Sequence, residues 1–209
     1  MRLKDKVTLV TGAGSGFGAG IARLFASEGA KVVVNDINDN AGQTIAQEIR
    51  QAGGSATYVH ADVASREDTR LMIQAAIDFG GRLDILVNNA GFTHRNKPFL
   101  DVTEDEFDSL FNLNVRAVWR ICKAIIPQMK IGGAGEVVLF SSTAGMQASA
   151  DVPLYSVTKA AVVMMTRTLA LSHADQNIRI NCVCPGSIAG PMLESSIAFA
   201  NGPEAQAER

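Results

Sequence analysis

Three shortages in the sequence each exclude a class of protein. The three cysteines are an odd and sparse set, which argues against a disulfide framework. The formal net charge of −2 gives no electrostatic reason to expect nucleic acid or an anionic membrane as a partner. No apolar run approaches the roughly 18 residues of a membrane span, and the basic residues at the start lead straight into a predicted strand, unlike a signal peptide. We therefore expect a soluble, cytoplasmic protein.

The cysteines offer no metal site either. Cys182 and Cys184 alternate around Val183 in a predicted strand, so both side chains point to one face. A zinc site would need further ligands, and no nearby histidine or cysteine offers any. We interpret the pair as two small buried hydrophobic residues, and we expect no metal in the function.

The hydrophobic patterning predicts a single α/β domain over residues 1–209. With 47% hydrophobic and 19% charged side chains, the chain can bury a sizeable core. The predicted strands cover residues 6–12, 31–36, 56–62, 83–91, 135–142 and 178–184, and the predicted helices cover residues 17–28, 39–52, 66–79, 104–130 and 154–174. We expect the long fourth helix to be disturbed near Pro127.

The predicted strands are continuous runs of Val, Ile and Leu, which is typical of strands buried on both faces of a parallel sheet. Their alternation with helices predicts a doubly wound parallel sheet with helices on both faces. Residues 187–209 are poorly periodic, and we expect an irregular end or a substrate lid there. Ligands bind outside the carboxyl ends of the strands in such a sheet, so the informative residues should follow the strands.

A glycine-rich turn follows the first predicted strand. The sequence "TGAGSGFG", residues 11–18, carries a glycine at every second position directly before a predicted helix. Glycine lets the backbone turn with positive φ and approach a ligand closely, and a helix N-terminus presents free N–H groups to a pyrophosphate. A tight strand-to-helix turn is the structural alternative, but the place of the motif in the first βα unit favours dinucleotide binding.

Asp36 ends the second predicted strand, where an acidic side chain suits the adenosine ribose of a dinucleotide. Its carboxylate can accept hydrogen bonds from the 2′- and 3′-hydroxyls, and it would repel a 2′-phosphate. No arginine occurs in the glycine-rich turn or just after Asp36 to neutralise such a phosphate. The sequence therefore favours NAD over NADP.

Polar residues also follow the third and fourth predicted strands. Asp62 could accept a hydrogen bond from an adenine amino group, with Val63 packing on the ring, or it could be a plain helix N-cap. The sequence "NNAG", residues 88–91, indicates tight backbone near a ligand, although the asparagine side chains could instead hold neighbouring strands in place. The sequence leaves both alternatives open.

The sequence "YSVTK", residues 155–159, opens the last predicted helix. Residues i and i+4 share one helical face, so Tyr155 and Lys159 lie side by side. We expect the ammonium to lower the phenol pKa from about 10, which would make Tyr155 a general acid or base near neutral pH. Ser142, after the fifth strand, could hold a substrate oxygen. A tyrosine packed at the sheet edge beside a snorkelling lysine is the alternative, but the glycine-rich turn and the serine favour catalysis.

These motifs together resemble the short-chain dehydrogenase/reductase family. "TGAGSGFG", "NNAG", the serine of "SSTAG", "YSVTK" and "PGSIAGPM" occur in the family's order and at about its spacing, from residue 5 to about residue 195. The chain most resembles the 3-oxoacyl-carrier-protein reductases and the NAD-dependent alcohol dehydrogenases. The resemblance implies a Rossmann fold and an NAD(P)-dependent oxidoreductase that transfers a hydride between the nicotinamide and a carbonyl or secondary alcohol.

The resemblance also implies a role for each motif residue. Tyr155 would be the catalytic acid or base, Ser142 would orient the carbonyl, and Lys159 would hold the nicotinamide ribose. Asn114, in the long helix, would support a proton-relay water. The cofactor would contact Gly12, Ser15, Gly16, Phe17, Gly18, Asp36, Ile37, Asp62, Val63, Asn88, Ala90, Gly91, Tyr155, Lys159, Pro185, Gly186 and Ile188.

The sequence departs from the family at two places. Gly190 stands where the family usually has a threonine that contacts the nicotinamide. The sequence ends at Arg209, so we expect the helix and seventh strand that usually follow to be absent from the sheet. A nucleotide-binding protein without turnover is therefore the alternative function. The long helix and the tyrosine-bearing helix commonly form an interface in the family, which implies a homo-oligomer, a dimer or a tetramer.

Three residues outside the motifs have structural interpretations. We expect His60 to be packed in the core, because it lies inside a predicted strand. We expect His94 to be exposed in the polar loop "THRNKP", although it could touch a substrate. Trp119 is expected at a helix–helix contact of the long helix.

Overall fold

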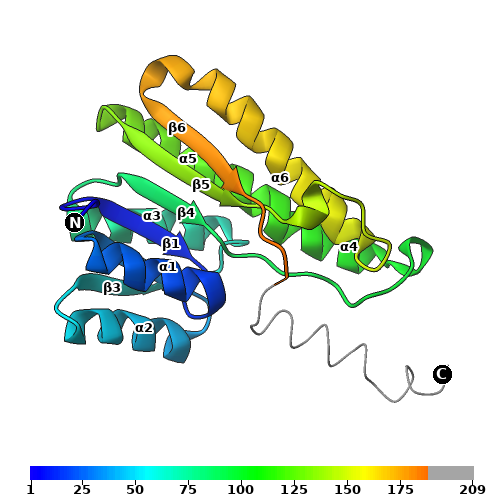
Figure 1. The fold of residues 1–209 in the computed structure, drawn as a ribbon, viewed down its shortest axis with the longest axis horizontal. Helices are drawn as coiled ribbons and strands as arrows, with labels where there is room; N and C mark the ends of the chain where they lie inside the picture. The colour runs from blue at the N-terminus through cyan, green and yellow to red at the C-terminus, as the bar shows by residue number, and fades with distance from the viewer. Residues whose placement is uncertain (188–209) are drawn as a thin grey trace.

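A computed structural model of the chain describes residues 1–187, in which six strands form one parallel sheet. The strands are β1 (Val7–Thr11), β2 (Lys31–Asp36), β3 (Ser55–His60), β4 (Ile85–Asn88), β5 (Gly135–Phe140) and β6 (Ile178–Val183). Their order across the sheet is β3-β2-β1-β4-β5-β6, and the arrows of β1, β4, β5 and β6 run the same way in Figure 1. This order is that of a doubly wound Rossmann fold, as predicted.

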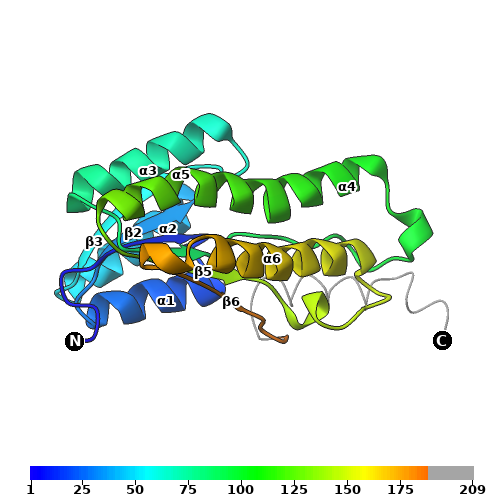
Figure 2. The same ribbon diagram turned by 90° about the horizontal axis from the view of Figure 1, so that it is seen from above.

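Helices cover both faces of the sheet. They are α1 (Gly16–Ser27), α2 (Asp39–Gln51), α3 (Arg66–Gly80), α4 (Glu104–Phe111), α5 (Val118–Ile131) and α6 (Pro153–Ser172), with short 3-10 helices at Phe99–Asp101, Thr143–Gly145 and Ala174–Gln176. Figure 2 shows α3 and α5 on one side of the sheet and α1 on the other. No helix within residues 1–187 is both long enough and apolar enough to span a membrane.

The central strands are buried on both faces, which explains their unbroken apolar runs. All five residues of β1 and all four of β4 are buried. Leu9 and Leu86 belong to the hydrophobic cluster formed with α3, α5 and α6, whereas Val10 and Val87 belong to the cluster formed with α1 and α2. Because successive side chains of a strand point to opposite faces, each strand contributes to both cores.

The long predicted helix is interrupted, but not at its proline. Asn112–Ala117 form a π-helical segment between α4 and α5, and α5 continues through Pro127. The expected disturbance near Pro127 is therefore wrong in position. A π-helical turn is rare and is often found at functional sites. This one contains Asn114, which is 1% exposed and contacts the loop after β4 and α6.

Both histidine interpretations are wrong. His60 is exposed, because β3 is an edge strand of the sheet that residues 1–187 form, and its last residue has a strand of that sheet on one side only. His94 is buried, with its Nδ1 2.5 Å from the carbonyl oxygen of Arg95, so Nδ1 must donate. A hydrogen bond from the Lys97 N–H to the Asp151 carbonyl attaches the polar loop around His94 to the loop after β5.

Two other burial expectations also need correction. Cys122 is buried, but Cys182 and Cys184 are only half-buried, because β6 is the edge strand of the described sheet. Trp119 is 49% exposed instead of being covered at a helix–helix contact, and the ammonium of Lys123 lies over its ring at 4.9 Å from the centroid.

Candidate active site

One long cleft opens at the carboxyl ends of the strands. Its volume of about 1310 Å³ exceeds the roughly 300–1,000 Å³ of a site for a drug-sized ligand. It crosses the point between β1 and β4 where the strand order reverses, which is the ligand-binding position in doubly wound sheets. The predicted site residues in its wall are Gly12, Ser15, Gly16, Phe17, Asp36, Ile37, Asp62, Val63, Ala90, Gly91, Ser142, Tyr155, Lys159, Pro185 and Gly186.

The other predicted site residues lie elsewhere. Gly18, Asn88 and Asn114 are buried behind the cleft wall. Ile188 and Gly190 fall outside the described residues, as does most of the expected lid. From the sequence we expect loops 92–98 and 143–153 to form pocket walls, without single residues assigned in them, and both loops do line the cleft. The further wall residues, in these loops and outside them, include Asn89, Phe92, Thr93, Asn96, Ser109, Asn112, Leu113, Phe140, Thr143, Gln147, Ser149 and Asp151.

The glycine-rich turn is shaped by close backbone contacts. Gly12 has a φ of +61°, and a Cβ there would lie 3.0 Å from the Cα of Ala90. A Cβ at Gly18 would lie 2.2 Å from the carbonyl oxygen of Gly12, so a larger residue cannot fit. Ser15 caps α1 without a side-chain hydrogen bond to the helix. The N–H groups of the first turn of α1 and the Ser15 hydroxyl can therefore face an anion in the cleft.

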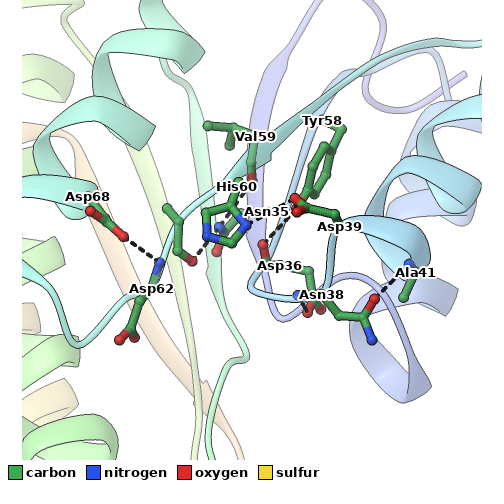
Figure 3. Close-up of polar contacts among 11 residues, drawn as sticks. Asn35, Asp36, Asn38, Asp39, Ala41, Tyr58, Val59, His60, Asp62 and Asp68 are labelled. Carbon is green, nitrogen blue, oxygen red and sulfur yellow. Dashed lines mark hydrogen bonds and ion pairs between the residues drawn. The ribbon is translucent and has the colours of Figure 1, made fainter.

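Asp36 joins the glycine-rich turn to the turn after β2. Its Oδ2 accepts a hydrogen bond from the Gly14 N–H at 2.8 Å, and its Oδ1 accepts one from the Asn38 N–H at 2.9 Å. Figure 3 shows this turn, with Asn38 capping α2 through the N–H of Ala41. The carboxylate is thus fixed at the wall of the cleft, where it can still accept hydrogen bonds from a ligand.

Asp62 is not the N-cap of α3, so the helix-capping role that the sequence left open for it is excluded. Ser65 caps that helix by accepting a hydrogen bond from the Asp68 N–H at 3.2 Å. The Asp62 side chain instead accepts a hydrogen bond from the Ala64 N–H at 2.8 Å. The backbone N–H of Asp62 donates to the Asp68 carboxylate at 3.0 Å (Figure 3). Asp62 therefore stands in the cleft wall as part of a tight turn.

The two asparagines of "NNAG" hold neighbouring strands together. Asn88 accepts a hydrogen bond from the Thr11 hydroxyl at 3.2 Å. The Asn89 side-chain amide donates to the carbonyl oxygens of Thr11 and Gly12, at 2.9 and 3.0 Å. Both asparagine side chains therefore hold neighbouring strands in place, which is the structural role that the sequence left open. Asn89 lines the cleft as well.

Asn114 clamps the loop after β4 to the tyrosine-bearing helix. Its amide donates to the Phe92 carbonyl at 2.8 Å and to the Thr158 hydroxyl at 3.2 Å, and its oxygen accepts from the Phe92 N–H at 3.2 Å. The Thr158 hydroxyl in turn donates to the Tyr155 carbonyl at 2.8 Å. Both amide hydrogens of Asn114 are thus engaged within the protein. The proton-relay role that the resemblance implies stays a prediction.

Lys159 is buried, with 5% of its surface exposed. Its ammonium donates to the Phe140 carbonyl at 2.9 Å. A Cβ at Gly91 would lie 3.3 Å from Nζ, and one at Gly145 would lie 2.7 Å from the carbonyl carbon of Lys159, so both glycines leave room for the lysine. Burial lowers the pKa of Lys159 to about 8, while the neighbouring Cys184 acts in the opposite direction.

Tyr155 lies in the cleft wall with its ring beside Lys159, whose Nζ is 5.6 Å from the ring centroid. Burial raises the pKa of Tyr155, and a hydrogen bond with Ser142 opposes this shift. The expected lowering of the phenol pKa by the lysine is therefore wrong, because burial outweighs any effect of an ammonium that lies over the ring. The phenol is protonated near neutral pH.

The Rossmann fold and the tyrosine, lysine and serine at its ligand-binding edge together define an oxidoreductase. The chain belongs to the short chain dehydrogenase family, whose sequence model matches residues 6–200. The predictions of family and fold are thereby confirmed.

Proteins of known sequence or structure support this membership. An uncharacterized oxidoreductase of Thermotoga maritima is 38% identical over 204 residues, which make up 98% of this chain and 80% of that protein. The 4-formylbenzenesulfonate dehydrogenase of Comamonas testosteroni is 41% identical over 203 residues, 97% of this chain and 81% of that protein. The crystal structure of a 3-ketoacyl-(acyl-carrier-protein) reductase from Brucella melitensis complexed with NADH matches with a TM-score of 0.89 and 35% identity, covering 95% of this chain and 83% of that one.

We expect Lys159→Met to stabilise the protein at pH 7. Burying the ammonium costs roughly 3 kcal/mol, since its pKa falls from 10.5 to about 8. This penalty is complete below pH 8 and disappears as the pH rises towards 10.5, so wild type should become more stable across that range. Methionine fills the same space but leaves the Phe140 carbonyl without its donor, which should reduce the net gain to about 1–2 kcal/mol.

Urea denaturation at pH 7 and at pH 10 measures the effect. Lys31→Met serves as the matched control, because Lys31 is exposed at the start of β2 and its replacement should change the free energy of unfolding little at either pH. A Lys159→Met protein that is less stable than wild type at pH 7 would contradict the burial penalty.

Proposed function

We propose that the chain is an NAD-dependent oxidoreductase that transfers a hydride between the nicotinamide and a carbonyl or a secondary alcohol. The observation that carries the proposal is a single cleft whose wall contains the glycine-rich turn at one end and Tyr155, Ser142 and Lys159 at the other. The related Brucella melitensis reductase was crystallised with NADH, which supports a nicotinamide cofactor. When bound, the nicotinamide would carry the hydride.

The residues at the glycine-rich end fit a dinucleotide. Gly16 has a φ of +52° and nothing within 4 Å of the position of a Cβ, so its backbone is open to the cleft. Ser15 and the N-terminus of α1 would hold the pyrophosphate. Asp36 would accept hydrogen bonds from the adenosine ribose, and its charge would disfavour the 2′-phosphate of NADP, since the next residue is the apolar Ile37.

The residues at the other end fit proton transfer to a substrate oxygen. Ser142 would hold the oxygen by a hydrogen bond, and Tyr155 would give it a proton or take one from it. The raised pKa of Tyr155 keeps the phenol protonated near pH 7, which suits a proton donor. The pKa of Lys159, about 8, leaves most of its amine charged at pH 7, so that it can donate to a ribose hydroxyl.

Small carbonyl compounds and alcohols form the proposed substrate class. The part of the cleft beyond Tyr155 is lined by side chains of mixed polarity, from Thr93 and Asn96 on one loop to Gln147 and Val152 on another. The relatives support this class, because one is a dehydrogenase of a formyl compound and another is a reductase of a 3-keto compound. The two activities to test first are those of a short-chain alcohol dehydrogenase and of a 3-oxoacyl-carrier-protein reductase.

We expect Tyr155→Phe to reduce turnover by about 10²- to 10⁴-fold, because it removes the proton donor. The affinity for NADH should change by no more than about fivefold, because the hydroxyl contributes at most roughly one hydrogen bond to holding a dinucleotide. Absorbance of the reduced nicotinamide, followed with panels of carbonyls and alcohols and with both cofactors, measures turnover. If wild type binds NADH but converts none of these compounds, the alternative of a nucleotide-binding protein without turnover is correct.

A homo-oligomer, a dimer or a tetramer, is also proposed. Large apolar side chains are exposed on α4, α5 and α6: Phe107 is 45% exposed, Trp119 49%, Val157 48% and Met164 57%. Tryptophan and methionine are enriched in protein interfaces, and a second copy of the chain would cover these side chains.

We expect Trp119→Glu to shift the protein towards smaller species, because a charge in the centre of an apolar interface is costly to bury. Leu24→Glu is the matched control: Leu24 is 51% exposed on α1, on the opposite face of the sheet, and its replacement should leave the assembly intact. Sedimentation velocity of the three proteins distinguishes the outcomes. A wild type that sediments as a monomer would refute the proposed assembly.

A further inference from the structure

Three polar side chains meet behind the turn that carries Asp36. The Tyr58 hydroxyl lies 2.8 Å from Oδ1 of Asp39 and 3.0 Å from the carbonyl oxygen of Asp36. Nδ1 of His60 lies 3.0 Å from the same Oδ1 of Asp39. Figure 3 shows Tyr58 and His60 both pointing towards Asp39, from β3 towards the start of α2. None of the three belongs to the cleft wall.

The protonation of this cluster follows from its contacts. The hydrogen bond from Tyr58 lowers the pKa of Asp39, and the contact with His60 acts in the same direction. An ionised carboxylate only accepts hydrogen bonds, so Nδ1 of His60 carries a hydrogen and donates it. Burial and the hydrogen bond to Asp39 raise the pKa of Tyr58, so the phenol keeps its proton. The Tyr58 hydrogen is shared between Asp39 and the Asp36 carbonyl.

Gly42 on α2 leaves the space that the Tyr58 ring occupies. A Cβ at Gly42 would lie 2.2 Å from Cε2 of the Tyr58 ring and 2.6 Å from Cδ2. The Cδ2–Cε2 edge of the ring therefore lies against the backbone of α2 at Gly42, in space that the side chain of another residue at position 42 would occupy. The parallel pairing of β2 with β3 places Asp36 beside His60. This register brings the Tyr58 hydroxyl within hydrogen-bond distance of the Asp36 carbonyl, at the start of the turn after β2.

The cluster and the cleft are connected through the Asp36 backbone and side chain. Tyr58 holds the Asp36 carbonyl from behind, and the carboxylate of the same residue holds the Gly14 N–H in the glycine-rich turn. Oδ2 and the Gly14 backbone are so close that a Cβ on Gly14 would lie 2.8 Å from Oδ2. A shift of the Asp36 backbone would therefore move the carboxylate and loosen the glycine-rich turn.

We propose that Tyr58 is a positioning residue for cofactor selection, whose hydroxyl holds the turn that presents Asp36 to the adenosine ribose. The inference rests on the proposed NAD-dependent function and extends it to residues outside the cleft. Asp39 keeps the Tyr58 hydroxyl directed at the turn, and His60 keeps the Asp39 carboxylate directed at Tyr58. Asp36 thus makes the protein prefer NAD to NADP, but its position depends on Tyr58, which is 22 residues further along the sequence.

Tyr58→Phe tests the inference, because it removes one hydroxyl and keeps the ring against Gly42. The dissociation constants of NADH, NADPH and ADP-ribose are measured by fluorescence or calorimetry for wild type and variant. NADH and ADP-ribose share the adenosine end, so both should bind about fivefold more weakly, which is the effect of one lost hydrogen bond. NADPH should change less, so the preference for NADH over NADPH should fall about threefold to fivefold. KM for NADH should rise while kcat changes little.

Gly42→Ala provides a second variant in which the hydroxyl is kept but the ring is displaced, and the preference for NADH should fall in the same way. The only other tyrosine, Tyr155, supplies the contrast: Tyr155→Phe should retain the preference and lose turnover. If both variants at positions 58 and 42 lower the melting temperature but keep the wild-type ratio of NADH to NADPH affinity, Tyr58 is only structural and the inference is overturned. A wild type that binds no NADH would instead refute the proposed function itself.

Discussion

Burial of Lys159 beside Tyr155 is the constraint on which the rest of the site depends. The two side chains lie one helical turn apart on α6, and the lysine is only 5% exposed. Burial disfavours the charged form of each group, so it raises the pKa of the phenol and lowers that of the ammonium. The protein keeps this geometry by fixing α6 at the lysine, whose backbone carbonyl accepts a hydrogen bond from the Ser141 hydroxyl at 2.8 Å. Glycines at positions 91 and 145 leave the necessary space.

The two ends of the cleft share one feature: side chains that lie behind the cleft wall form hydrogen bonds that fix the residues of the wall. At the end of the cleft that holds Tyr155, Asn114 in the π-helical segment ties the loop after β4 to Thr158 on α6. At the glycine-rich end, Tyr58 holds the backbone of Asp36, which in turn holds Gly14. The parallel sheet makes this possible, because all its strands end at the same edge and their loops are neighbours.

The sequence was sufficient to predict what depends on local pattern, and insufficient for what depends on burial. Unbroken apolar runs located the six strands of the described sheet, and most of the site residues predicted from the motifs lie in the cleft wall. The phenol pKa was mispredicted, because a helical i, i+4 pair shows proximity but not desolvation. The exposure of His60 and the burial of His94 depend on strand order and on loop contacts. The contact of Tyr58 with Asp36 depends on the register of β2 and β3, which spacing alone does not give.

The central claim is that burial, and not the lysine charge, sets the protonation of Tyr155. Ultraviolet difference titration of phenolate formation tests it most directly, in a Tyr58→Phe background where Tyr155 is the single remaining tyrosine. The structure predicts that phenolate appears only above pH 10, the ordinary phenol pKa. Phenolate absorbance at pH 7 to 8 in the protein without added nucleotide would show that the ammonium outweighs desolvation, and would contradict the account.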